Sequence, residues 1–219
     1  MPFGESQARV YVSIVDGLLA VRSSESDPKA VKRELKTGHT IYERRYKNVT
    51  GRLKEIGFRS NDFGGKKWDD LYLLIYDGQD HYQISMPFPG KYSLSVLRVI
   101  KNVDLAAEIT FSPWTKTKAD GKVSASLFLN PTGSKESVPW YFTKEDPKGL
   151  PELVPYTVPG SADTKWSDVE RNKFFRNMIE ADIAPRLQAV WAAPPISKVY
   201  VDTPTDPNEI TDPVDDLPF

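Results

Sequence analysis

The sequence predicts a mainly β protein with one core domain, a helix near its carboxyl-terminal end and an acidic tail. Between Tyr42 and Leu129, β-branched and aromatic residues alternate with polar ones and are interrupted by glycine-containing turns, a pattern typical of strands. Between residues 167 and 192, apolar residues recur every four positions, which is typical of one helix face. Residues 199–219 carry six acids and no lysine or arginine, a composition that favours disorder.

Composition narrows the class of protein. A chain of 219 residues suits one sizeable domain with appendages. The absence of cysteine excludes disulfides, thiolate zinc sites and cysteine nucleophiles. No apolar run approaches the roughly 20 residues of a membrane helix, and the segment MPFGESQARV lacks the blocks of a signal peptide. We therefore expect a cytoplasmic protein.

The charge is divided unevenly along the chain. The net charge is −1, from 30 acids and 29 bases, but without the six acids of residues 199–219 the rest has 24 acids against 29 bases. A basic body joined to an acidic tail predicts a polyanionic partner, with a tail that competes with this partner or recruits a basic protein. The alternative is an ordinary solvated surface.

The first expected elements form an extension before the main pattern. β-branched residues flank Asp16-Gly17, a dipeptide suited to a tight hairpin turn, so residues 9–22 are predicted to form two strands. The polar segment 23–39 is predicted to be a loop, with a short helix between Pro28 and Lys36.

The main pattern predicts five strands and one helix. Residues 42–58 are expected to form one strand, and the basic, glycine-rich loop RSNDFGGKK follows at 59–67. Residues 68–88 are expected to form a hairpin, 91–103 a short helix, and 107–130 a second hairpin with a basic tip at 115–122. The expected core residues of the first hairpin are Leu71, Leu73, Ile75, Tyr82, Ile84 and Met86.

This order of elements matches the OB-fold, a five-stranded Greek-key barrel with its helix between the third and fourth strands. OB-folds bind oligonucleotides or oligosaccharides through strands 2 and 3 and through the loops that join strands 1 to 2 and 4 to 5. In this sequence those loops are 59–67 and 115–122. We expect the domain to span 1–145, including the N-terminal strands.

Beyond residue 130, prolines predict extended connections. The helix over 167–192 is expected to begin with a capping box of Ser167 and Glu170 and to kink or restart at Pro185. Its apolar face could cover the barrel or join two copies of the chain, so a homo-oligomer stays open. We divide this part into 146–193, the proline-rich connection and helix, and 194–219, a disordered acidic tail. The residues of the apolar face are Phe175, Ile179, Ile183, Leu187 and Trp191.

Patterns of catalytic residues are scarce. His39 and His81 lack the spacing of a metal site or a catalytic triad. Asp69 and Asp70 alternate across a strand and point to opposite faces, and FGGKK lacks the ending of a phosphate-binding loop. We expect no enzymatic activity, no metal and no cofactor.

The side of the 68–76 strand opposite its core residues carries Trp68, Tyr72 and Tyr76, with Arg52 and Lys54 expected on the neighbouring strand. Rings that stack on bases, together with cations that neutralise phosphates, are what a single-strand platform needs. The alternative is that these rings pack under the N-terminal segment or the C-terminal helix as a second core. The predicted nucleic-acid-binding residues are Arg52, Lys54, Arg59, Lys66, Lys67, Trp68, Tyr72, Tyr76, His81, Trp114, Lys116, Lys118 and Lys122.

The last residues, Asp215, Asp216, Leu217, Pro218 and Phe219, read DDLPF. Together with a basic β-barrel and a proline-rich connection, this ending resembles the bacterial and phage single-stranded DNA-binding proteins, whose tails end in aspartates, an apolar residue, proline and phenylalanine. The resemblance implies that these five residues bind replication and repair proteins. The longer body, the extra strands and the helix imply a divergent member, which would lie in the host cytoplasm if it is encoded by a phage.

The predicted function is therefore to coat and protect single-stranded DNA in replication, recombination or repair, and to recruit partners through the tail. The alternative is a carbohydrate-binding or protein-interaction β-domain, whose aromatic residues would stack on sugar rings. Salt dependence distinguishes the two functions, because only nucleic acid releases counterions from its phosphates on binding.

Overall fold

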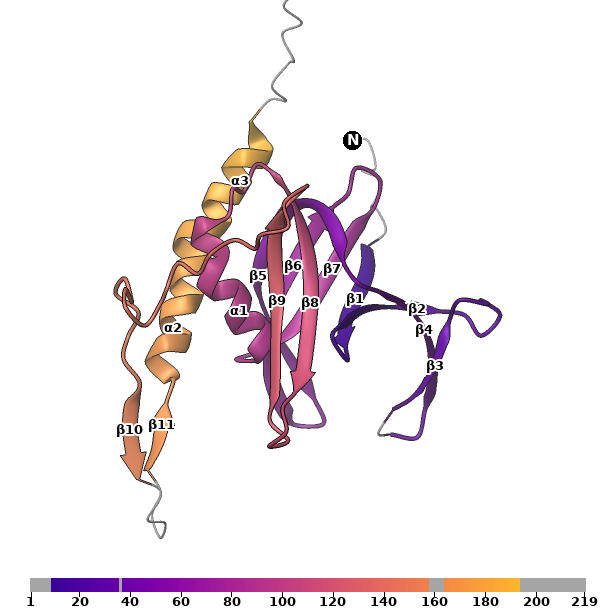
Figure 1. Ribbon diagram of the computed structural model, residues 1–219, viewed down its shortest axis with the longest axis horizontal. Helices are drawn as coiled ribbons and strands as arrows, with labels where there is room; N and C mark the ends of the chain where they lie inside the picture. The colour runs from indigo at the N-terminus through magenta and orange to yellow at the C-terminus, as the bar shows by residue number, and fades with distance from the viewer. Residues whose placement is uncertain (1–8, 36, 158–163, 194–219) are drawn as a thin grey trace, which may run out of the picture.

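The computed structural model describes residues 9–35, 37–157 and 164–193. These residues form a mainly β protein with one large mixed sheet, a separate two-stranded sheet and helices packed on one side (Figure 1). The strand order in the large sheet is β3-β4-β2-β1-β7-β6-β5-β8-β9. All its pairings are antiparallel except that of β1 with β7.

The N-terminal strands are β1 (Arg9–Val15), β2 (Leu18–Ser23), β3 (Val31–Glu34) and β4 (Thr40–Tyr46). The expected hairpin at Asp16-Gly17 is present, and both residues have the positive φ of a tight two-residue turn. The short helix predicted between Pro28 and Lys36 is wrong, because this segment contains β3, which pairs with β4. Its polar sequence suits an exposed edge strand of a sheet.

The strand predicted over 42–58 is two strands. β4 ends at Tyr46 and pairs with β2, whereas β5 (Val49–Phe63) pairs with β6 (Lys66–Tyr76) and β8. The loop predicted at 59–67 is also wrong, because both strands continue through it to a two-residue turn. Gly64 and Gly65 make this turn with φ values of +60° and +77°, which glycine adopts without strain. The β5–β6 pair is therefore a long ribbon.

The remaining expected elements follow in the predicted order: β7 (His81–Phe88), α1 (Lys91–Val99), β8 (Glu108–Thr117) and β9 (Val123–Pro131). A 3-10 turn, Ile100–Asn102, extends α1. Leu71, Leu73, Ile75 and Ile84 are fully buried, Met86 is nearly so, and Tyr82 is partly buried against the core. This confirms the predicted core face of the first hairpin.

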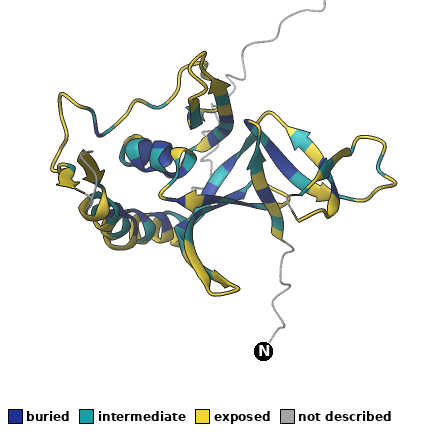
Figure 2. Ribbon diagram, turned by 90° about the horizontal axis from the view of Figure 1, so that it is seen from below, coloured by how far each residue is buried: buried dark blue, intermediate teal, exposed yellow. Residues whose placement is uncertain are grey.

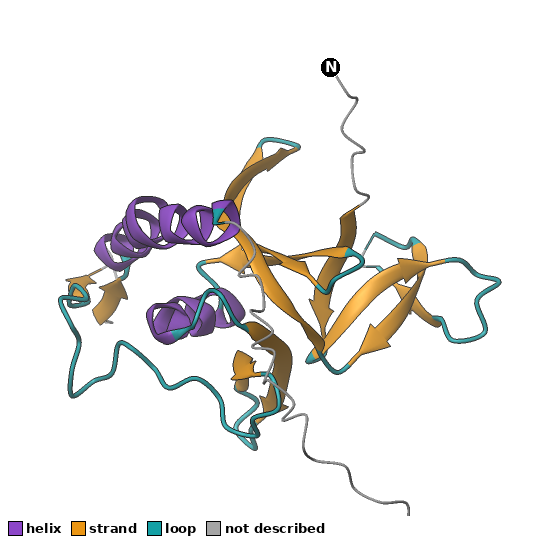
Figure 3. Cartoon of the chain, turned by 90° about the horizontal axis from the view of Figure 1, so that it is seen from above, coloured by secondary structure: helices purple, strands orange, loops and turns teal. Residues whose placement is uncertain are grey.

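The core lies between the two halves of the curved sheet. Inward-facing residues of β6 and β7 belong to the same apolar cluster as Phe111, Leu127 and Leu129 of β8 and β9. In Figure 1, β8 and β9 lie in front of the other central strands, and α1 lies beside them. Figure 2 shows the buried residues concentrated on α1 and the central strands. Figure 3 shows the helices gathered on one side and the N-terminal strands on the other.

The C-terminal helix consists of α2 (Val169–Met178), a π turn (Ile179–Ile183) and α3 (Ala184–Ala192). Its N-cap is Asp168, so the capping box predicted for Ser167 is wrong. Pro185 lies in the first turn of α3, but the backbone stays helical from α2 through the π turn into α3. The predicted restart is therefore only a change from π to α hydrogen bonding just before Pro185. The expected apolar face is buried in the chain's own core from Phe175 to Leu187.

The helix covers an edge of the sheet that no strand occupies. β8 pairs with β5 only from Val49 to Arg52. Beyond this point the edge of β5 faces the helix, and Trp191 Nε1 donates a hydrogen bond of 2.8 Å to the Leu53 carbonyl. An uncovered edge would expose unpaired backbone groups, so the helix completes the β core.

The connection between β9 and α2 is mostly extended and includes a small hairpin, β10 (Val154–Thr157) with β11 (Thr164–Ser167). Phe142 anchors it, because its buried ring makes edge contacts with Phe174 and Phe175 of α2. In the part of the chain that the structure describes, no helix is long and apolar enough to span a membrane.

Candidate nucleic-acid interface

The face of β1, β7, β6 and β5 that points away from the core is called the outer face here. By register it contains Arg9 and Tyr11 of β1, Gln83 and Ser85 of β7, Trp68, Asp70 and Tyr72 of β6, and Glu55, Gly57 and Arg59 of β5. Gln83 is almost completely buried. Arg9 donates to its side chain, and it lines a cavity together with Arg33 and Glu43 of the N-terminal strands.

Tyr72 is held in the middle of the outer face. Its hydroxyl donates to Glu55 Oε1 at 2.5 Å, and its ring lies so close to Gly57 that a Cβ there would be 2.8 Å from the hydroxyl oxygen. Burial and the Glu55 carboxylate raise the pKa of Tyr72 to about 12. Arg9 lies 4.0 Å from the same carboxylate and donates to Gln83 Oε1 at 3.3 Å. The ring is thus a neutral, positioned platform.

The ribbon beyond Tyr72 carries predicted residues that are free of the core. Trp68 is 40% exposed and Phe63 is 81% exposed, since the ribbon extends past the layer that could bury them. Arg59 and Lys66 have no ion-pair partner among the residues that the structure describes. Lys67 pairs with Asp62 in the register, and side chains alternate along a strand, so it points to the other side of the ribbon from Trp68.

Two acids of this ribbon, Asp69 and Asp70, have hydrogen-bond partners. Asp69 Oδ2 accepts a hydrogen bond of 2.5 Å from Arg176 of α2, and Ser60 donates to its other oxygen. Asn61 donates to Asp70 at 2.9 Å. Arg176 therefore neutralises Asp69, whereas Asp70 keeps its charge and lies opposite Arg59 in the register of β5 and β6.

The structure brings Arg52, Lys54, Tyr76 and His81 together, but it places Trp191 of α3 over them. The Arg52 guanidinium lies 4.4 Å and the Lys54 ammonium 5.6 Å from the centre of the Trp191 ring. Tyr76 stacks on His81 at 4.8 Å and makes an edge contact with Trp191. Tyr76 therefore packs under the C-terminal helix, which was the alternative interpretation of this ring.

His81 is buried, and this corrects its place in the predicted platform. Lys54 Nζ lies 2.8 Å from its Nε2, while no described group is within hydrogen-bonding distance of its Nδ1. Burial first, and then the charges of Lys54 and Arg9, lower the pKa of His81 below its usual value. The folded protein therefore holds this imidazole neutral.

This pKa shift predicts a loss of stability in mild acid. As the pH falls through about 6.5, histidine in the unfolded chain takes up a proton that folded His81 resists, so the free energy of unfolding should decrease until the folded pKa is passed. Urea unfolding at about pH 7.5 and 5.5 measures this decrease. His81→Gln should reduce it, and His39→Gln, which removes an exposed imidazole, is the comparison variant. Equal pH dependence in the wild type and His81→Gln would contradict the assignment.

The remaining predicted residues lie on the β8–β9 hairpin. Trp114 is exposed and packs against Phe128 of β9, with 6.3 Å between the ring centres. Lys116, Lys118 and Lys122 are exposed at or near the tip, where Lys122 lies 3.4 Å from Asp120. Because β8 and β9 face β6 and β7 across the core, Trp114 and Trp68 point away from each other. The predicted residues therefore form two groups.

The N-terminal strands bring residues to the candidate site that were not predicted from the sequence. Beside the outer face, a cavity of about 380 Å³ is lined by Tyr11, Ser13, Arg22, Arg33 and Ser85, among others. Tyr11 is 60% exposed. Both oxygens of the buried Glu43 carboxylate accept from Arg33, which lies across this cavity. No local signal could have placed these residues here, because their position depends on the parallel pairing of β1 with β7.

No protein-family model, curated protein or solved structure matches this chain. Within residues 9–35, 37–157 and 164–193, no three His, Asp or Glu side chains form a group that could hold a metal ion. The partner-binding tip, Asp215 to Phe219, lies outside the described residues, so its role stays a prediction. Any proposal about function therefore rests on the geometry of this site and on the sequence.

Proposed function

We propose that this protein binds single-stranded DNA through the solvent-facing side of its curved sheet. The observation that carries the proposal is the combination of positioned or exposed rings with cations on the outer face and ribbon. Tyr11, Tyr72 and Trp68 supply rings, while Arg59 and Lys66 lie beside them. Neither cation forms an ion pair in the described chain, although Asp70 is the cross-strand neighbour of Arg59. A strand with unpaired bases offers a π-face and a phosphate at every step, so this surface suits it without sequence preference.

The connectivity of the central strands supports the same proposal. We number β5 to β9 as strands 1 to 5, so that α1 lies between strands 3 and 4. In this numbering strand 1 pairs with strands 2 and 4, strand 2 pairs with strand 3, and strand 4 pairs with strand 5. These four pairings are compatible with an OB-fold, whose binding face is built on strands 2 and 3. The free edge of the third strand, β7, pairs with β1. We infer an OB-type arrangement whose sheet is extended by the N-terminal strands.

The charges favour nucleic acid over a neutral sugar. Carbohydrate recognition would use the same rings but gains nothing from Arg59, Lys66 or the lysines of the β8–β9 tip. A phosphate backbone gains from each of them through counterion release. Recruitment of replication or repair proteins through Asp215 to Phe219 belongs to the same proposal and rests on the sequence alone.

Titration with an unstructured oligothymidine at two salt concentrations tests the proposal. We expect tight binding to the single strand, weaker binding to a duplex, and a log affinity that falls with log salt by about 0.7 per phosphate neutralised. Binding to a β-linked oligosaccharide serves as the comparison and should be undetectable. An affinity for the single strand that does not change with salt, or equal affinity for duplex and single strand, would exclude this function.

A further inference from the structure

A second cationic site lies away from the outer face, where α1, α2 and the connection after β9 meet. A cavity of about 450 Å³ there is lined by Arg98, Trp140, Phe142, Leu150, Glu152 and Arg171, among others. This volume falls within the range of small-molecule sites. The cavity therefore has room for one nucleotide unit.

Two guanidinium groups share this cavity without an acid partner. Arg98 is half-buried, and burial together with the charge of Arg171 lowers its pKa. Arg171 donates through Nε to the Pro151 carbonyl at 2.5 Å. In the described chain no carboxylate lies within 4.0 Å of either guanidinium group, and Glu152, which also lines the cavity, pairs with neither. Two like charges held together in this way favour an anion between them.

Trp140 provides an aromatic wall beside these charges. Its ring lies 5.1 Å from the Arg98 guanidinium, and the residue is 52% exposed. The backbone on either side is fixed, since Tyr141 N donates to the Arg98 carbonyl at 2.7 Å and the Pro139 carbonyl accepts from Asn102 at 3.0 Å. One side of the ring contacts Arg98, so the exposed part is available to a ligand.

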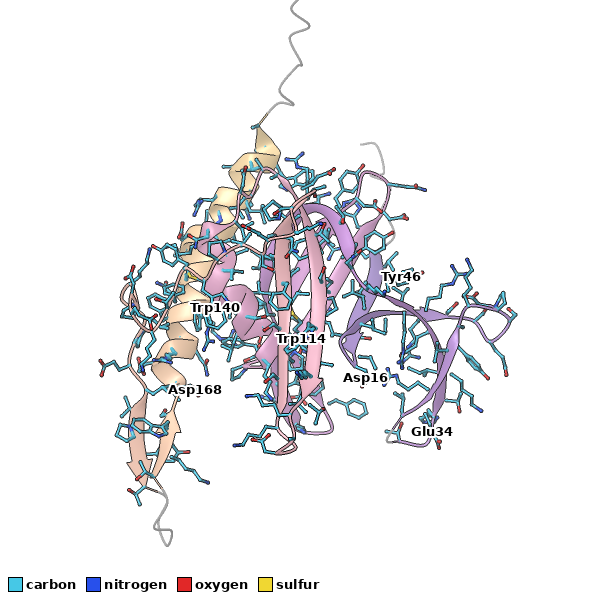
Figure 4. The ribbon with its side chains drawn as sticks, in the orientation of Figure 1. Asp16, Glu34, Tyr46, Trp114, Trp140 and Asp168 are labelled. Carbon is cyan, nitrogen blue, oxygen red and sulfur yellow. The ribbon has the colours of Figure 1, made fainter. Side chains whose placement is uncertain are left out.

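An aromatic row connects this cavity with the β8–β9 hairpin. Trp140 and Phe128 line the same small cavity next to α1, and Phe128 packs against Trp114. Figure 4 shows Trp114 over β8 and β9 and Trp140 beside α1. All three residues are exposed, and Lys116 follows Trp114 on the same side of β8. Neighbouring exposed apolar side chains of this kind often mark an interaction site.

We propose that Trp114, Phe128 and Trp140 form a second contact segment for single-stranded DNA, which ends with a phosphate between Arg98 and Arg171. This inference rests on the proposed function and extends it to the side of the molecule opposite Trp68. An acidic peptide could also meet two arginines, but it would leave the aromatic row unused. A polymer that alternates a ring with a charge uses the row and the cavity together.

Strand length provides the test, because a short oligothymidine can occupy the outer face alone. Trp140→Ala should weaken binding of a strand of about 30 nucleotides by about 5- to 150-fold and leave one of about 8 nucleotides nearly unchanged. Trp166→Ala is the matched control, since Trp166 is 60% exposed on β11 and lies outside the row. Arg171→Gln should reduce the salt slope for the long strand by about 0.7. Thermal unfolding of each variant checks that the fold is intact.

The outcomes separate the two proposals. If the wild type binds neither strand, the proposed function fails and this inference fails with it. If the wild type binds both strands and neither Trp140→Ala nor Arg171→Gln changes binding of the long one, only the second contact segment is excluded. If the two variants instead weaken binding of a polyglutamate peptide and leave DNA binding unchanged, the cavity is a peptide site and the inference is overturned.

Discussion

Replacing Gly51 with alanine should destabilise the fold by about 3 kcal/mol or more, at the upper end of overpacking effects. A Cβ at this buried position would lie 2.5 Å from the Tyr76 carbonyl oxygen and 2.9 Å from Ile75 Cγ2. Neither neighbour can move aside, because Tyr76 pairs with Arg52 and His81 in the sheet and Ile75 is fully buried. Urea unfolding measures the change: the urea concentration at the midpoint should fall, and the slope of free energy against urea concentration should stay the same.

Gly57→Ala is the matched control on the same strand. There the Cβ would meet the Tyr72 ring, with the hydroxyl oxygen nearest at 2.8 Å, and a side chain can swing away where backbone cannot. We expect a stability loss below about 1.5 kcal/mol and a fall of the Tyr72 pKa from about 12, seen by ultraviolet titration. Equal destabilisation by the two substitutions would show that the approach of β5 to Tyr76 is not as close as described.

Trp68→Ala should lower the affinity for single-stranded DNA by about 1 to 3 kcal/mol and leave stability almost unchanged. The reason is that Trp68 extends from the ribbon beyond the core and has a free ring face. Tyr76→Ala should do the reverse, because its ring is held between His81 and Trp191. We expect it to reduce the free energy of unfolding by roughly 2 kcal/mol.

Parallel oligothymidine titrations and urea melts of the two variants distinguish these roles. If Tyr76→Ala lowers the affinity for DNA without lowering stability, then Tyr76 contacts the ligand instead of only packing against Trp191. If Trp68→Ala unfolds the protein instead, the ribbon is part of the core and the outer face loses its main stacking residue.

The order of the central elements could be predicted because it depends on local patterns. Leu71, Leu73 and Ile75 recur with a period of two, flanked by Asp70, Tyr72 and Tyr76, and this period persists wherever one face is buried. The change of partner between β4 and β5 falls at Lys47 and Asn48, within a segment that is already mostly polar, so these two residues did not stand out as a strand boundary. A strand boundary of this kind depends on which other strand each segment pairs with in the folded sheet.

The candidate site was predictable only in part, for the same reason. Trp68 and Tyr72 were found because their alternation with the core residues is visible in one strand. The cover of Arg52, Lys54 and Tyr76 by Trp191 could not be found, because it depends on where a helix more than a hundred residues later crosses β5 (|i−j| = 138 for Trp191 and Leu53). The contribution of Arg9 and Tyr11 likewise required the parallel pairing of β1 with β7.

That parallel pairing also determines when the surface is complete during synthesis. β1 leaves the ribosome before the other strands that the structure describes, yet Gln83, to which Arg9 donates, follows 74 residues later. The β1–β2 hairpin can form early from local contacts, but it must wait for β6 and β7 before it can dock, and such long-range pairing is intrinsically slow. Arg9 reaches Glu55, and so joins the Tyr72 platform, only after docking. A nascent chain therefore cannot present this surface until its first strand has joined the sheet.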